Sequence, residues 1–133
     1  MTRNSAVHLD QLCGQWLPQL TGVRVRCAPI GDHSSALFAE ELDSISQAIA
    51  KRRHEFATGR WLARRTMAEL ELPAGIIGRG EQRQPIWPEG SLGSITHADD
   101  IVAVAIGNDS SCRSIGIDLE RWPRVTSELH SKL

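Results

Sequence analysis

Residues 51–72 read KRRHEFATGRWLARRTMAELEL, and this stretch decides the fold. It contains no proline and a single glycine, and its apolar residues recur at helical spacing: Phe56, Ala63, Met67 and Leu70. The pattern predicts one long helix with an apolar stripe, ended by Pro73. Just upstream, residues 37–49 carry Leu37, Leu42, Ile45 and Ile49 at roughly helical spacing, and we expect a second helix there.

Short strands lie on both sides of this helix in the sequence. Residues 23–27 alternate valine or cysteine with arginine, which is typical of a half-buried strand. Residues 91–97 and the unbroken apolar run 101–106 are separated by a turn at 98–100, and residues 115–120 predict a third strand closed by Pro123. The expected architecture is one α+β domain over residues 1–133, an antiparallel sheet packed against the long helix. The predicted core consists of Phe56, Ala63, Met67, Leu70, Ile95, Val102, Val104, Ile106, Ile115, Ile117 and Leu119.

Composition narrows the classes of protein that the chain can belong to. The 133 residues carry a formal net charge of −1, so any anion site must come from a local cluster of basic residues. The three cysteines (Cys13, Cys27 and Cys112) are far apart and form no CxxC pair, which indicates neither a disulfide framework nor a zinc ribbon. No signal-peptide pattern and no long apolar run is present, so we expect a cytoplasmic protein without a membrane span.

Five arginines lie on the predicted long helix: Arg52, Arg53, Arg60, Arg64 and Arg65. Spacings of seven and four place Arg53, Arg60 and Arg64 on roughly one face, where guanidinium groups can bind phosphates bidentately. The alternative interpretation is a solvated helix face with Glu55 and Glu69 as surface partners. Nucleic-acid binding is a further interpretation, which the balanced net charge disfavours.

A pair of carboxylates stands at Asp118 and Glu120, in the sequence Gly116-Ile117-Asp118-Leu119-Glu120. In a strand these two side chains share one face about 6.5–7 Å apart at the backbone. Oxygen ligands of this kind suit Mg²⁺, which keeps waters and substrate phosphates in its shell. The plainer alternative is a strand with one wet, charged face.

A third cluster is Gly93-Ser94-Ile95-Thr96-His97, at the end of a predicted strand. Its hydroxyls and imidazole can donate to phosphate oxygens, although His97 also fits a surface turn. The sequence has no HExxH, Walker loop, GxGxxG or GxSxG pattern, so zincin, P-loop, Rossmann and serine-hydrolase interpretations have no support.

Taken together and in order, these blocks resemble a known enzyme family. They are similar to the N-terminal half of the surfactin- and enterobactin-type 4′-phosphopantetheinyl transferases. Four blocks carry the resemblance: the helix sequence from Arg52 to Arg60 with Ala63-Arg64, the sequence 83–90, the cluster 93–97 and the motif 116–120. The resemblance runs from about Leu37 to Glu120. It implies one half of a pseudo-dimeric fold and Mg²⁺-dependent transfer of the 4′-phosphopantetheine arm of coenzyme A to a serine of an acyl or peptidyl carrier protein.

The resemblance also implies roles for individual residues. Asp118 and Glu120 would hold Mg²⁺ against the coenzyme A pyrophosphate. Arg53 and Arg60 would receive coenzyme phosphates, and Arg83, Gln84 and Pro85 would border the adenine. Thr96 and His97 would contact the phosphates, with His97 the more important. Phosphoryl-type transfer rests mainly on positioning and charge stabilisation, which agrees with such a set.

The chain departs from the family in one respect. Members with both halves carry a Trp-x-x-Lys-Glu-type helix in the second half, and no such segment occurs in these 133 residues. Three interpretations follow: a part of a longer enzyme, a half that associates with itself or with a second half-domain chain, or a non-catalytic coenzyme A-binding or partner-binding module. We expect no nucleic-acid partner and no membrane partner.

Overall fold

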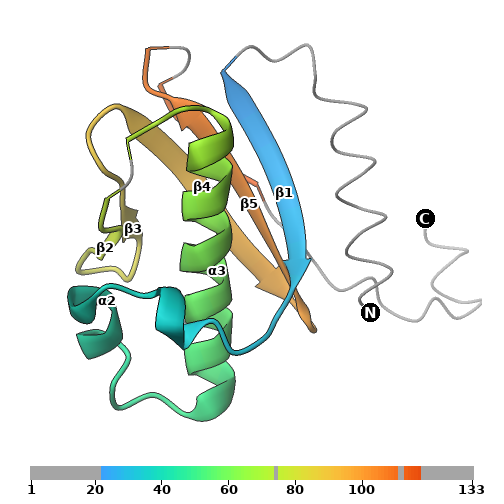
Figure 1. Ribbon diagram of the computed structural model, residues 1–133, viewed down its shortest axis with the longest axis vertical. Coiled ribbons are helices and arrows are strands. Elements are labelled where there is room, and N and C mark those ends of the chain that lie inside the picture. Colours follow the sequence, from blue (N-terminus) through green and yellow to red (C-terminus); the bar gives the residue numbers. More distant parts are fainter. Residues whose placement is uncertain (1–21, 74, 111–112, 118–133) are drawn as a thin grey trace, which may run out of the picture.

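The computed structural model describes residues 22–73, 75–110 and 113–117. Within them the elements run in the order β1 (Val23–Pro29), the 3-10 helix η1 (Ser34–Ala36), α2 (Ala39–Asp43), α3 (Ala50–Glu69), β2 (Gly78–Arg79), β3 (Pro85–Ile86), β4 (Ser91–Ala98) and β5 (Ile101–Asn108). An antiparallel sheet in the order β1–β5–β4 has α3 packed across one face (Figure 1). The predicted α+β class, with a long helix on an antiparallel sheet, is confirmed.

The central strand is β5, whose residues 101–107 are all buried. A strand that is apolar on both faces belongs in the middle of a sheet, where it has a partner at each edge. The tight turn at Asp99 and Asp100 places β4 along one edge, with Ala98 paired to Ile101. β1 takes the other edge, from Val23 opposite Gly107 to Pro29 opposite Ile101.

The prediction of a third strand at residues 115–120 is wrong in the part that the structure describes. Residues 115–117 have no regular secondary structure, and residues 118–120 lie outside the described residues. β1 is the third strand instead, because its seven residues match the register of β5 without a gap. The sequence pattern indicated both segments as strands but could not say which one pairs with the buried run.

The strand register determines which side chains face α3. Val102, Val104 and Ile106 of β5 share a buried cluster with Leu62, Ala63 and Met67 of α3. Residues paired across a sheet lie on the same face. Gly93, Ile95 and His97 of β4 are paired with Ile106, Val104 and Val102, so these three also face α3. Ser94 and Thr96, paired with Ala105 and Ala103, lie on the opposite face of the sheet.

The predicted long helix is confirmed as α3, although it ends at Glu69 rather than at Leu72. Glu71 adopts a left-handed conformation (φ 58°), and the Leu72 N–H donates to the Met67 carbonyl at 2.9 Å. Together with the bond from the Glu71 N–H to the Ala68 carbonyl, this forms a Schellman motif that stops the helix. Local hydrogen bonding therefore ends the helix before Pro73 does.

The second predicted helix is much shorter than the apolar repeat suggested. Only Ala39–Asp43 is α-helical, because the hydroxyls of Ser44 and Ser46 donate to the carbonyls of Glu41 and Asp43 and compete with the helical ladder. The apolar stripe is not buried as a unit. Leu37 and Ile45 are buried, whereas Leu42 and Ile49 are exposed, and the carboxylate of Glu41 takes an inward position with 2% exposure.

Most of the predicted core is found as expected. Phe56, Ala63, Met67, Val102, Val104 and Ile106 are buried, and Leu70 and Ile95 pack against the core while partly exposed. Ile115 and Ile117 are half-buried, and Leu119 lies outside the described residues. Among the described helices, none is both long enough and apolar enough to cross a membrane.

Candidate functional site

A pocket opens between α3, β4 and the small hairpin of β2 and β3. Five of its lining side chains are basic: Arg52, Arg60, Arg79, Arg83 and His97. One lining residue, Glu55, is acidic, and the rest are Phe56, Gly59, Pro85 and Ile95. The volume is about 110 Å³, well below the roughly 300–1,000 Å³ of a complete ligand pocket. The space and the charge suit one phosphate-sized anionic group.

The close approach of α3 to β4 forms the inner wall of this pocket. Gly59 makes that approach possible, because a Cβ at this position would lie 2.9 Å from Cγ2 of Ile95. One turn earlier on the helix, Glu55 comes within 3.5 Å of the Nδ1 atom of His97 on β4. Two elements far apart in the sequence are thus brought together at the pocket.

Arg60 forms the buried part of the site, with 5% exposure. Its Nε donates to the Ile77 carbonyl at 3.3 Å and its Nη2 to the Gly78 carbonyl at 3.1 Å, while its guanidinium lies over the Phe56 ring at 4.3 Å. Burial lowers the pKa of Arg60 to about 10, and the nearby Glu41 charge opposes that shift. The group therefore still carries its positive charge at neutral pH, held in place by neutral carbonyls.

A buried ion pair holds the hairpin against α3. Glu41 of α2 contacts Arg64 Nη1 at 2.6 Å through its Oε2 atom, which also accepts from the Ile77 N–H at 2.9 Å. Its Oε1 atom accepts from the Phe38 N–H at 2.9 Å. Arg79, in β2 just beyond, donates from Nη1 to the Ser44 carbonyl at 2.8 Å. These bonds fix the position of the hairpin beside the pocket, and therefore the position of Arg79.

The hairpin turn places Arg83 at the pocket in a strained conformation. The Arg83 N–H donates to the Gly80 carbonyl at 2.9 Å, and the Gly80 N–H to the Gln84 carbonyl at 2.8 Å. This is a three-residue hairpin loop whose last position is left-handed and usually glycine. Arg83 occupies it with φ 66°. The Gln84 side chain folds back and its Oε1 accepts from the Gln82 N–H at 2.9 Å, which stabilises the turn.

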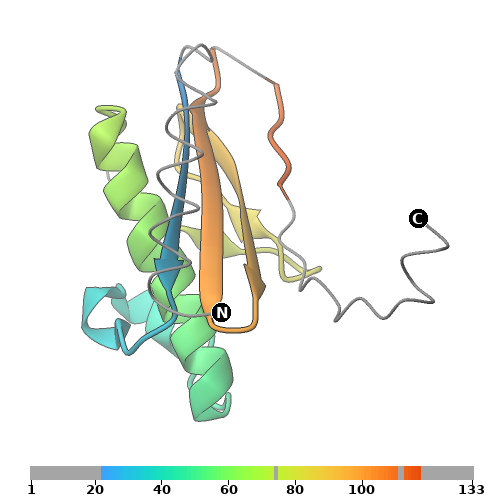
Figure 2. The same ribbon diagram turned by 90° about the vertical axis from the view of Figure 1, so that its right-hand side faces the viewer.

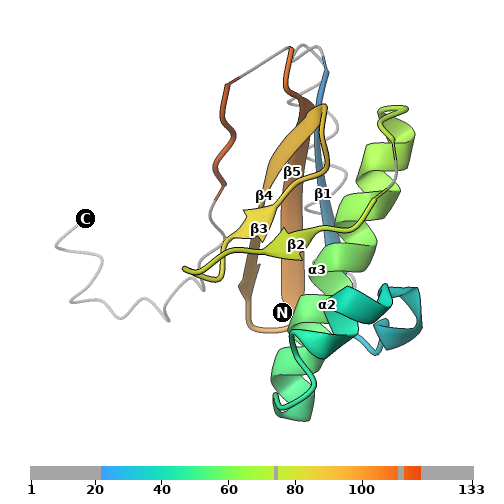
Figure 3. The ribbon, with the colours of Figure 1, turned by 90° about the vertical axis from the view of Figure 1, so that its left-hand side faces the viewer.

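The segment before the predicted metal motif lies on the other side of the sheet from α3. The Ile117 N–H donates to Oγ of Ser94 at 3.3 Å, and Ser94 is on the face that points away from α3. Figures 2 and 3 show residues 113–117 and α3 on opposite sides of the sheet. Asp118 and Glu120 lie outside the described residues. Among the described residues, no cluster of three or more histidine, cysteine or acidic side chains could hold a metal.

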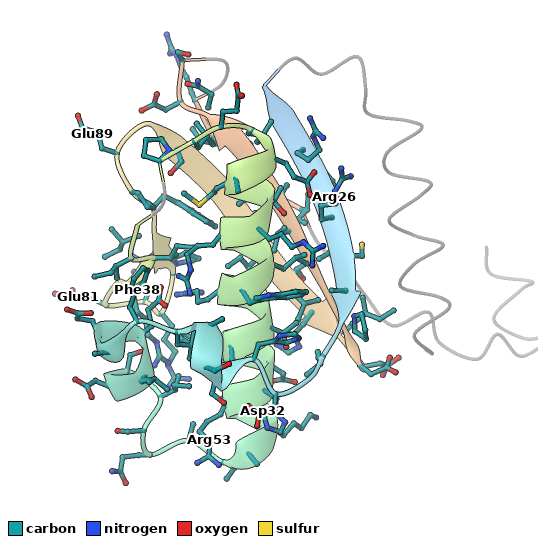
Figure 4. All side chains as sticks on the ribbon, viewed as in Figure 1. Arg26, Asp32, Phe38, Arg53, Glu81 and Glu89 are labelled. Atoms are coloured by element: carbon teal, nitrogen blue, oxygen red, sulfur yellow. The ribbon has the colours of Figure 1, made fainter. Side chains whose placement is uncertain are left out.

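The predicted site residues separate into two groups. Arg60, Arg83, Pro85 and His97 line the pocket together. Arg53, Gln84 and Thr96 are not among its lining residues. Thr96 faces the opposite side of the sheet, and Arg53 is exposed near the start of α3, where its Nη1 donates to the Ala48 carbonyl at 3.2 Å (Figure 4).

Two basic residues of the pocket, Arg52 and Arg79, were not predicted as site residues from the sequence. Arg52 belongs to the helix arginine set, and its spacing of eight from Arg60 also allows a shared side of the helix. That spacing could have suggested Arg52 as a site residue. It was not sufficient, because the helix alone does not show which of its sides faces the hairpin. For Arg79 there was no signal, because its place depends on the contacts of the hairpin with α2.

The fold and the site define the class of protein: an α+β domain whose helix and hairpin form a basic pocket that suits an anionic group. A family model described as the 4′-phosphopantetheinyl transferase N-terminal domain matches residues 39–107, slightly more than half of the chain. The chain belongs to this family. The match covers all the residues that line the pocket.

Individual relatives agree with this assignment. The chain is 46% identical over 76 residues to 4′-phosphopantetheinyl transferase Npt of Nocardia iowensis. This alignment covers 57% of this chain and 34% of the relative. It is 40% identical over 89 residues to 4′-phosphopantetheinyl transferase Svp of Streptomyces mobaraensis, covering 67% and 36%. It is 34% identical over 79 residues to enterobactin synthase component D of Salmonella typhi, covering 59% and 32%. The aligned part spans about a third of the length of these relatives.

Proposed function

We propose that this chain provides the N-terminal half of an enzyme that transfers 4′-phosphopantetheine from coenzyme A to a serine of an acyl or peptidyl carrier protein. The observation that supports this most directly is the pocket with five basic side chains and one acid. Coenzyme A is a polyanion that carries a pyrophosphate and a separate phosphate monoester. A small basic pocket of about 110 Å³ suits one of these groups rather than the whole molecule.

In this proposal the chain's own residues bind and orient the coenzyme. Arg60 and Arg79 are held by backbone carbonyls, so their charges are preorganised before the anion arrives. Arg83, Arg52 and His97 complete the cationic lining from the hairpin, the helix and β4. Such a set supplies positioning and charge stabilisation, which is what transfer at a phosphorus centre requires from a protein.

Asp118 and Glu120 are the proposed holders of Mg²⁺. Two carboxylates separated by one residue are a suitable donor set for a hard divalent cation, and the Ile117 bond to Ser94 anchors the chain immediately before them. When bound, the ion would neutralise charge on the pyrophosphate and on the departing adenosine 3′,5′-bisphosphate. We propose the cytoplasm as the compartment, in line with three cysteines that are far apart in the sequence and form no CxxC pattern.

A non-catalytic coenzyme A-binding or partner-binding module is the second candidate. The observation that favours it is the pocket itself, whose basic lining would bind the coenzyme whether or not a carrier protein is modified. The two candidates differ in whether carrier protein is modified, and they share the coenzyme pocket.

Titration calorimetry of coenzyme A into the 133-residue chain, with and without Mg²⁺, tests the proposal. We expect binding that is strengthened by Mg²⁺ and loses this Mg²⁺ dependence in Asp118→Ala, because the carboxylate ligand is gone. Asp109→Ala is the matched control, since this exposed carboxylate lies in the turn after β5. A folded chain that binds no coenzyme A would contradict the assignment of the pocket. Incubation with carrier protein then separates enzyme from binding module.

Arg83→Gly should change stability and coenzyme binding in opposite directions. Glycine adopts the left-handed conformation without the steric cost that Arg83 bears, so we expect the free energy of unfolding to rise by about 1 kcal/mol. Coenzyme A affinity should fall about tenfold, because a charged donor to phosphate is lost. Urea unfolding and calorimetry on the same preparation measure both. A variant that is more stable and binds equally well would show that Arg83 does not contact the ligand.

A further inference from the structure

One carboxylate stands among the five basic side chains that line the pocket. Among the described residues that line the pocket, Glu55 is the single acid, and its side chain is 9% exposed. Its Oε2 atom lies 3.5 Å from Nδ1 of His97, and its Oε1 atom lies 3.9 Å from Nη1 of Arg52. The two oxygens therefore lie next to two different basic groups of the pocket.

A buried carboxylate at an anion site needs an explanation, because its charge repels the ligand. A cation can be held in place without an acid. Arg60 and Arg79 are each fixed by neutral backbone carbonyls, which do not offset the positive charge. His97 and Arg52 have side chains 42% and 40% exposed, and each has Glu55 as an acidic neighbour on the pocket side. Without a partner, exposed side chains of this kind sample several rotamers, and ligand binding must then order them.

We propose that Glu55 is a positioning residue, which holds the His97 ring through Nδ1 so that Nε2 is presented to the bound anion. This inference rests on the proposed function for the identity of the anion, a phosphate group of coenzyme A. Glu55 touches neither the reacting atoms nor, in this assignment, the ligand itself. It acts through His97 and, more loosely, through Arg52.

The chemistry of the imidazole ring explains why a carboxylate suits this task. A ring that donates from Nδ1 to Glu55 and from Nε2 to a phosphate oxygen must carry both protons. A carboxylate oxygen is a strong acceptor for the Nδ1–H, and accepting that proton leaves Nε2 turned toward the anion. The other charged groups that line this pocket are Arg52 and Arg60 of α3 and Arg79 and Arg83 of the hairpin, and all of them are cationic. Among the charged groups of this lining, Glu55 is accordingly the one that can accept a hydrogen bond from the ring.

Side-chain nitrogen NMR of the histidines tests the contact without any ligand. At a pH where the ring is neutral, we expect His97 to carry its proton on Nδ1 in the wild-type chain. In Glu55→Ala the proton should redistribute toward Nε2, and in Glu55→Gln it should stay on Nδ1, because the amide oxygen still accepts. His97→Gln identifies the signal. His33, stacked on Trp61 at 4.0 Å, is the internal control and should not change in any variant.

Calorimetry with coenzyme A then tests the effect on the pocket. We expect Glu55→Ala to weaken binding about tenfold, which is the lower end of what loss of an orienting partner costs. The Glu55→Ala, His97→Ala double variant should lose little beyond His97→Ala, since both changes remove the same interaction. Arg65→Ala serves as the matched surface control on the same helix, because Arg65 is exposed, lies over the Trp61 ring and does not line the pocket.

Two results would overturn the inference. One is an unchanged His97 tautomer in Glu55→Ala, which would show that the carboxylate does not hold the ring. The other is tighter coenzyme A binding in both Glu55→Ala and Glu55→Gln, which would show that Glu55 merely weakens the positive field. If the wild-type chain binds no coenzyme A, the proposed function fails for this chain, while the NMR result still decides the role of Glu55.

Discussion

Glu41→Ala will lower the free energy of unfolding of this chain by about 3–5 kcal/mol, the cost of breaking a buried ion pair from one side. The carboxylate is 2% exposed and has three partners: Arg64 at 2.6 Å and the N–H groups of Ile77 and Phe38, both at 2.9 Å. Alanine removes all three bonds. It leaves the buried Ile77 N–H without its acceptor, and the largely buried Arg64 guanidinium keeps its bond to the Ala36 carbonyl but loses this counter-charge. Domains are stable by about 5–15 kcal/mol, so this one change removes a large fraction of the total.

Urea unfolding followed by circular dichroism measures this loss. Glu40→Ala is the matched control, because Glu40 is the exposed neighbour on the same short helix and should change stability by less than about 0.5 kcal/mol. Arg64→Met should also be strongly destabilising, and the double variant should lose clearly less than the sum of the two. A loss below about 1 kcal/mol in Glu41→Ala would mean that water replaces the carboxylate and that the ion pair does not hold α2 and the hairpin to α3.

Gly93→Ala is the second large effect, with an expected loss of about 3 kcal/mol in the free energy of unfolding. A Cβ at this position would lie 2.6 Å from the Ala105 carbonyl oxygen and 2.8 Å from Cδ1 of Ile106. The nearer atom belongs to the backbone of the central strand, so it cannot move aside without disturbing the ladder between β4 and β5. Overpacking of a well-packed interior costs about 1–3 kcal/mol, and contact with backbone places this case at the upper end.

The control for Gly93→Ala is Gly116→Ala, because a Cβ at Gly116 would meet no atom within 4 Å. Both variants add the same methyl group, and both restrict the unfolded chain equally. Thermal unfolding should therefore show a clear fall in Tm for Gly93→Ala and nearly none for Gly116→Ala. Equal Tm values would show that β4 and β5 separate easily at this point, and that Gly93 is not required for their close pairing.

Local sequence patterns were sufficient to predict the main elements. The uninterrupted run 51–72 predicted α3, and the apolar run 101–106 after a short polar turn predicted the β4–β5 hairpin. Both depend on interactions between residues close in the sequence, so the pattern and the structure agree. The apolar repeat at 37–49 predicted a longer helix than the structure has. Serine hydroxyls, which also act locally, break this helix after Asp43.

The candidate site was predicted in part, and the missing part depends on distant contacts. His97, Arg60, Arg83 and Pro85 were named from the sequence and line one pocket. Thr96 was grouped with His97, yet neighbours in a strand point to opposite faces, and the pocket lies on the α3 side. The spacing of the helix arginines could not distinguish Arg52 from Arg53, because it does not show which side of the helix the hairpin covers.

The sequence by itself determined where α3 and the strands β1, β4 and β5 form, and that basic side chains concentrate on the helix and just beyond it. Only the tertiary structure decided that β1 completes the sheet, that Glu41 is buried between α2, α3 and the hairpin, and that Glu55 faces His97. The physical reason is the range of the interactions. Periodicity fixes the angles between residues on one element, whereas burial and charge pairing depend on which other element packs against each side.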